Sequence, residues 1–177
     1  MADSPDAYLD KSPEASRMGK AAEYLVAAVC ILATRGELNV STSIVDDEGV
    51  DLVFHLRDST ATLAVQVKAR MSDGVVVGRG RFQALVRASN FRARPDLEML
   101  FVLVDNANGA IETAWLVPSA DFDRLHGKPT TKERLRFSAS IKEGSRDKWS
   151  PYRLTAAELP ERIVERLNGL GSWEADR

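Results

Sequence analysis

Cysteine is almost absent from this chain, and long hydrophobic runs are absent altogether. A single cysteine among 177 residues excludes intrachain disulfides and thiolate zinc clusters. Cys30 lies in an apolar stretch, which favours a small buried hydrophobic residue over a nucleophile. No run approaches the roughly 18 apolar residues of a membrane span. We therefore expect a cytoplasmic protein without membrane contact.

Several catalytic signatures are missing as well. No serine lies in a nucleophile-elbow context, and the two histidines, His55 and His126, have no convincing triad partners. The glycines in residues 74–81 fit neither a P-loop nor the spacing of a dinucleotide fingerprint. These absences argue against a serine hydrolase and a nucleotide-binding enzyme.

The composition is typical of one globular domain, but the charge is unevenly distributed. Hydrophobic residues make up 44% and charged residues 28%, with a net charge of −2. Residues 1–16 predict a flexible acidic lead-in, and residues 17–177 a single domain. Residues 66–94 hold seven Lys and Arg against one Asp. Such a block suits a polyanion, although a solvated surface is the alternative.

Hydrophobic spacing predicts an α/β fold, with a mixed central β-sheet and helices on both sides. Turn signals separate the elements, and Thr155 and Glu158 form a capping box that opens the last helix. The predicted helices are 16–35, 81–91, 120–125 (capped by Ser119) and the segment after Thr155; the predicted strands are 38–44, 49–56, 61–69, 98–105, 111–118 and 135–141, with 74–78 as an extension of the sheet.

The third predicted strand has one polar face. Side chains alternate along a strand with period two. Apolar residues therefore share one face and polar residues the other: Leu63, Val65, Val67 and Ala69 against Gln66, Lys68 and Arg70. The polar row is either a solvated face or one wall of an active site.

Two carboxylates can join this row. Glu23 falls on or beside the apolar stripe of the first helix, where an unpartnered carboxylate is costly. Asp51 opens the neighbouring strand, and adjacent strands lie about 4.8 Å apart. Carboxylate, carboxamide and carbonyl oxygens suit a hard cation such as Mg²⁺. With a nearby ammonium group, this set of residues suits metal-assisted hydrolysis of a phosphodiester.

With Glu23 in GKAAE, Asp51 in GVD and the QVK of residues 66–68, the sequence resembles the PD-(D/E)XK nuclease superfamily, in its restriction-endonuclease-like and Holliday-junction-resolvase-like branches. The resemblance covers roughly residues 17–105 and implies an αβββαβ core. Residues 106–177 would then be a C-terminal decoration.

The resemblance also implies a role for each matching residue. Asp51 would be the central metal ligand, Gln66 would stand in place of the second acid, and Val67 would offer its backbone carbonyl. Lys68 would position the attacking water, and Glu23 would assist the metal or its waters. The implied activity is Mg²⁺- or Mn²⁺-dependent hydrolysis of DNA that leaves 5′-phosphate ends, in repair or defence, by a possible homodimer. Gln66 removes one negative charge from the metal site.

Arginines beyond the motif are candidate phosphate contacts. Arg70 continues the polar face of the third strand. If residues 80–93 form the helix that follows, Arg87, Arg92 and Arg94 border the cleft and can hold phosphates.

Two other interpretations stay open. The chain could be a non-catalytic nucleic-acid-binding or interaction module on a nuclease fold, or a plain α/β domain in which Glu23 and Lys68 form a buried ion pair. Metal binding at Asp51 distinguishes the first from a nuclease. The carboxylates at 46–48 (Asp46, Asp47 and Glu48) are either extra ligands or, as is more usual, a turn whose carboxylates face water.

Overall fold

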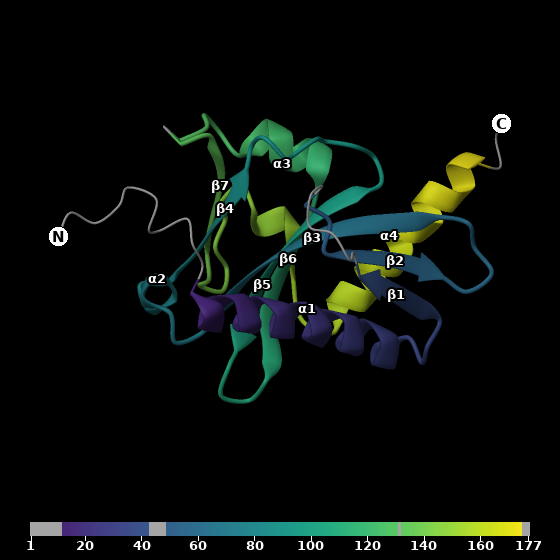
Figure 1. Ribbon diagram of the computed structural model, residues 1–177, viewed down its shortest axis with the longest axis horizontal. Helices are drawn as coiled ribbons and strands as arrows, with labels where there is room; N and C mark the ends of the chain where they lie inside the picture. Colours follow the sequence, from purple (N-terminus) through teal and green to yellow (C-terminus); the bar gives the residue numbers. More distant parts are fainter. Residues whose placement is uncertain (1–11, 43–48, 131, 175–177) are drawn as a thin grey trace.

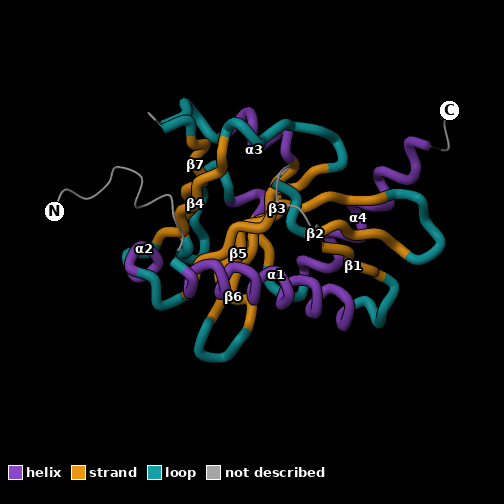
Figure 2. The backbone as a smooth tube through the Cα atoms, viewed as in Figure 1, coloured by secondary structure: helices purple, strands orange, loops and turns teal. Residues whose placement is uncertain are grey.

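The computed structural model describes residues 12–42, 49–130 and 132–174, which form two β-sheets and their flanking helices (Figure 1). Figure 2 shows the strands gathered in the middle and the helices outside them. In chain order the elements are α1 Pro13–Ala33, β1 Leu38–Thr42, β2 Leu52–Leu56, β3 Thr62–Met71, α2 Val75–Gly78, β4 Arg81–Arg87, β5 Leu97–Asp105, β6 Ala110–Pro118, α3 Ser119–Leu125, β7 Arg134–Ser140, the 3₁₀ turn η1 Ser150–Tyr152, β8 Arg153–Leu154 and α4 Glu158–Glu174.

The larger sheet is mixed, as expected. Its strand order is β1-β2-β3-β5-β6-β8. The pair β3–β5 is parallel, and the other neighbours are antiparallel. A parallel pair needs a crossover connection, and here α2 and β4 lie between β3 and β5 in the chain. The strand β4 pairs with β7 in a separate two-stranded sheet.

Helix α1 begins and ends where its sequence signals it. Ser12 is the N-cap and its hydroxyl accepts a hydrogen bond from the Ala15 N–H (3.2 Å), with Pro13 following in the first turn. After the last turn, Gly36 adopts a left-handed φ of 83° and donates to the Ile31 carbonyl. The helix predicted at 16–35 is therefore present, but it begins at Pro13, inside the segment predicted as a lead-in, and ends at Ala33.

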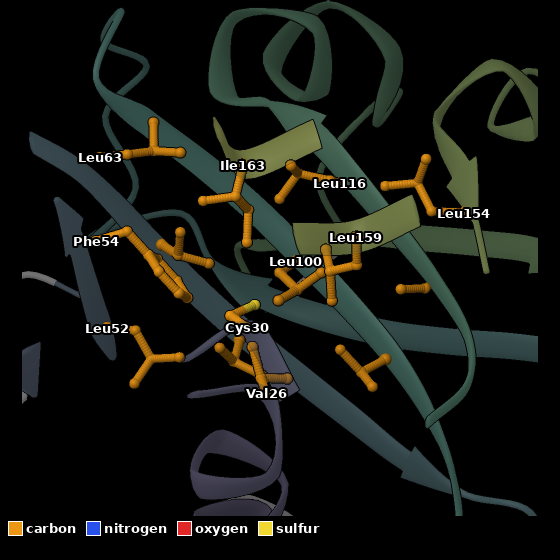
Figure 3. Close-up of a cluster of buried hydrophobic side chains, with 14 of the residues drawn as sticks. Val26, Cys30, Leu52, Phe54, Leu63, Leu100, Leu116, Leu154, Leu159 and Ile163 are labelled. Carbon is orange, nitrogen blue, oxygen red and sulfur yellow. The ribbon is translucent and has the colours of Figure 1, made fainter. Parts of the chain in front are cut away.

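Helices α1 and α4 pack on one face of the larger sheet, and Figure 3 shows the buried apolar side chains between them and the strands. Their buried side chains pack on apolar residues of β2, β3, β5 and β6; the labelled members are Val26, Cys30, Leu52, Phe54, Leu63, Leu100, Leu116, Leu154, Leu159 and Ile163. Burial raises the pKa of Cys30 to about 12. Cys30 is thus a core residue, as its apolar setting predicts, and carries no thiolate at neutral pH.

The other face of the sheet is covered by α3 and the β4–β7 pair. Phe101 of β5 stacks on Phe137 of β7 with ring centroids 3.7 Å apart. Phe122 of α3 and Trp149 complete an aromatic core, and both are fully buried. Helices therefore lie on both sides of a mixed sheet, and the predicted fold class is confirmed.

The prediction of a helix at 81–91 is wrong, because residues 81–87 form strand β4. Its burial alternates strictly, with Phe82, Ala84 and Val86 buried and Leu85 44% exposed. A helical stripe would have buried Leu85 together with Phe82. Pairing with β7 over all seven residues satisfies the backbone of this segment.

Two smaller predictions also need correction. Residues 75–78 form the one-turn helix α2, not an extension of the sheet. Ser119 does not cap α3, whose N-cap is Pro118. The Ser119 hydroxyl instead accepts from the Arg94 N–H (2.9 Å) and donates to the Arg94 carbonyl (2.7 Å), so it anchors the chain that leads into β5.

The last helix, α4, starts from the predicted capping box. The Thr155 N–H donates to the Glu158 carboxylate (2.7 Å), and the Glu158 N–H donates back to the Thr155 hydroxyl (3.3 Å). Leu159, Ile163 and Leu167 are buried against the sheet, and Val164 is partly buried. Throughout the described ranges, no helix is long and apolar enough to cross a membrane.

Candidate functional site

The polar row of β3 lies in the part of the strand that extends beyond its pairing with β2. Strand β2 pairs only with Thr62–Val65, whereas β5 pairs with β3 as far as Met71. Gln66 and Lys68 are half-buried there, and Val67, between them, faces the α1–α4 core. The alternation predicted for this strand is therefore correct, and it presents the two polar side chains beside the start of β2.

Asp51 joins β2 to β3 at this point. Its backbone N–H donates to the Val65 carbonyl (2.9 Å). Its carboxylate Oδ2 accepts from the Val67 N–H at 2.6 Å, which is short even for a bond to a charged acceptor. The carboxylate thus lies against the backbone of the QVK segment. The structure thus brings Asp51 to the backbone of the predicted QVK segment, through Val65 and Val67.

Gly49 contacts Gln66, a feature that the sequence reading missed. Its φ is +70°, and a β-carbon added there would lie 2.7 Å from Gln66 Nε2 and 3.8 Å from Oε1. A glycine two residues before the acid was the available signal. Only glycine gives both the left-handed backbone and the room for this amide.

The acid of the first helix is held by a partner on its own helix. Glu23 is 9% exposed, and Lys20 Nζ donates to its Oε2 at 2.5 Å. This hydrogen bond is the main cause that raises the pKa of Lys20, and the Asp51 carboxylate contributes a further increase. The ammonium group of Lys20 therefore interacts electrostatically with both Glu23 and Asp51. The i, i+3 spacing to Glu23 was the signal for this residue, which the sequence reading passed over.

The donor atoms suit a hard cation, but few of them are charged. Glu23 and Asp51 supply carboxylates, Gln66 a carboxamide oxygen and Val67 a backbone carbonyl, all of them oxygen ligands of the kind Mg²⁺ takes. Within the described part of the chain, no group of three or more His, Cys, Asp or Glu is placed to hold a metal. The carboxylates at 46–48 lie outside the described residues.

The predicted phosphate contacts do not share one helix. Arg70 is exposed at the end of β3, and Arg87 lies on the outer face of β4. Arg92 and Arg94 lie in the loop before β5, where Arg92 donates to the Phe91 carbonyl (2.7 Å). Arg94 is ion-paired with Asp96 at 3.0 Å, which reduces its availability for a phosphate.

A second buried carboxylate, Glu98, has a structural role. It is fully buried at the start of β5, and Arg166 of α4 donates to its Oε1 at 2.5 Å. Burial raises the pKa of Glu98 in spite of the nearby guanidinium. The pair joins α4 to β5, on the sheet face opposite Lys68.

Gly49→Ala should slow any reaction at this site by about ten- to a hundredfold, because the new methyl group displaces the Gln66 amide. The matched control is Gly109→Ala, which has a similar φ of +62° but no atom within 4 Å of the added carbon. Both variants carry the backbone strain, and only the first disturbs Gln66. Equal rates of that reaction in the two variants would contradict a role for this contact.

No protein-family model and no curated protein matches this chain. Among solved structures, its fold resembles a bacterial homing endonuclease, I-Ssp6803I, with a TM-score of 0.54, 15% identity, and coverage of 91% of this chain and 97% of the other. MepB is less similar, with a TM-score of 0.35, 9% identity, and coverage of 67% and 87%. The first likeness shows that the chain shares its fold with a nuclease.

Proposed function

We propose that this protein is a metal-dependent endonuclease of the PD-(D/E)XK type that hydrolyses DNA. The observation that carries the proposal is the 2.6 Å hydrogen bond from the Val67 N–H to the Asp51 carboxylate. It holds the acid that precedes β2 against the Gln66–Val67–Lys68 segment of β3, so the two parts of the motif lie next to each other. The shared fold with a homing endonuclease supports the same function.

Each residue has a distinct task in this proposal. Asp51, Gln66 and the Val67 carbonyl would hold Mg²⁺ or Mn²⁺, and the metal would supply Lewis-acid polarisation of the phosphate. Lys68 orients the attacking water and stabilises the charge that develops on the phosphoryl oxygens. Glu23, whose carboxylate is ordered by Lys20, would assist the metal or its waters.

Gln66 favours a second candidate function. With glutamine in place of the usual acid, the site has one negative charge fewer. Among the described residues, its carboxylates are those of Glu23 and Asp51. A weakened metal site would leave a non-catalytic nucleic-acid-binding module on the same fold.

A role in repair or defence and a homodimeric assembly also belong to the proposal of a nuclease.

A cleavage assay with and without metal tests the function. Linear duplex, single-stranded and four-way-junction DNA are incubated with the full chain in Mg²⁺, Mn²⁺ or EDTA. We expect cutting with either metal, none in EDTA, and recovery when metal is added back in excess. Cutting that persists in EDTA would contradict the proposal. Salt-sensitive binding without cutting in any metal would establish the non-catalytic module instead.

A further inference from the structure

The outer face of the β4–β7 pair forms a basic surface separate from the residues around Asp51. Figure 1 shows the two strands side by side at one end of the molecule. We call this surface the ribbon face, and define it by the outward residues of the two strands: Arg81, Gln83, Leu85, Arg87, Arg134, Arg136, Ser138 and Ser140.

The charge of the ribbon face is of one sign. Four of its eight positions are arginine and none is acidic. Along the described chain, none of the four arginines is ion-paired with a carboxylate. Arg87 and Arg134 are direct cross-strand partners, and like charges in that position destabilise a sheet. Folding does not account for this pairing, whereas a bound polyanion does.

Polar and apolar groups lie between these charges. The Ser138 hydroxyl accepts from Arg81 Nη2 (2.9 Å) and from Gln83 Nε2 (3.4 Å), so the two long side chains are ordered side by side. Leu85 is 44% exposed and lies opposite Arg136. The ribbon face therefore offers hydrogen-bonding groups and an apolar contact as well as positive charge.

The inner side of the pair makes it a rigid platform. Phe82, Ala84 and Phe137 are buried in the aromatic core, and Phe137 stacks on Phe101. Phe101 is also the register partner of Lys68. The ribbon face thus belongs to an element packed on the side of the central sheet to which Lys68 points.

We propose that the ribbon face enters the major groove of duplex DNA and positions it for the site around Asp51; this rests on the proposed function. Two strands about 4.8 Å apart fit a groove about 12 Å wide. Arg87 and Arg134 bind phosphates at one end of the pair. Arg81 and Gln83 contact base edges, and Leu85 contacts thymine methyl groups.

Binding is measured by fluorescence anisotropy in EDTA, so that the assay does not depend on cleavage. Arg87→Ala/Arg134→Ala should weaken duplex binding at least tenfold and lower the slope of log K against log salt by about two. Gln83→Ala/Leu85→Ala should weaken binding about tenfold and leave the slope unchanged. The control is Arg57→Ala, an exposed arginine in the β2–β3 turn, which should bind like the wild type. Thermal unfolding checks that each variant is folded.

The groove is tested with modified duplexes. DNA whose cytosines carry glucosylated hydroxymethyl groups, which fill the major groove, should bind at least tenfold more weakly, whereas a minor-groove ligand such as netropsin should not compete. Ribbon variants that bind like Arg57→Ala, or equal affinity for duplex RNA, would overturn the inference. A chain that never cuts DNA but binds it through the ribbon face would refute the nuclease and leave this inference standing.

Discussion

Asp51→Ala should lower the rate of metal-dependent cleavage by about a thousandfold or more. Asp51 is one of two described carboxylates at the site and the one in contact with the QVK segment. Lys68→Ala should lower the rate about a hundred- to a thousandfold, because the charge that develops on the phosphate then lacks the ammonium group of this lysine. Initial rates on a labelled duplex at saturating Mg²⁺ measure both effects.

Matched variants separate chemistry from folding. Asp51→Ala leaves the Val67 N–H without its acceptor, at a cost of about 1–3 kcal/mol in stability. Asp51→Asn keeps an acceptor there, so it should unfold like the wild type and yet be inactive. Glu112→Ala and Lys128→Ala, both exposed, serve as controls that retain full activity. Wild-type cleavage by folded Asp51→Asn would rule out Asp51 as the central ligand.

Phe137→Ala should lower the free energy of unfolding by about 3–5 kcal/mol. Phe137 is fully buried and contacts four aromatic rings: Phe82, Phe101, Trp115 and Trp149. Its removal leaves a cavity between β7 and the larger sheet, so the ribbon face should also lose its fixed orientation and bind DNA more weakly. Chemical denaturation with urea measures the stability change.

The control for this change lies on the same two-stranded sheet. Leu85→Ala removes a side chain of the outer face that is 44% exposed, and should change stability by less than about 0.5 kcal/mol. Phe137→Leu fills part of the cavity and should fall between the two. A loss below about 1 kcal/mol for Phe137→Ala would show that the β4–β7 pair is held to the sheet by other contacts.

The local signals that predicted the fold are those whose physics acts within a few residues. The Thr155–Glu158 capping box defines the start of α4 through bonds within the first turn of the helix. The alternation of Gln66 and Lys68 with apolar residues places them on one face of β3, because period two is a property of any extended chain. The QVK side of the candidate site followed from this alone.

What the sequence by itself determined, then, was the mixed α/β class, the helices at both ends and the polar row of β3. The tertiary structure alone decided that residues 81–87 are a strand, because Phe82 and Val86 suit either period and pairing with β7, about fifty residues later, settles the choice. The tertiary structure also decided that Asp51 contacts Val67 and that Lys20 interacts with both Glu23 and Asp51. It placed the arginines of β4 and β7 on one face. These contacts depend on strand register and helix packing, which join residues far apart in the chain and leave no trace in the spacing of neighbours.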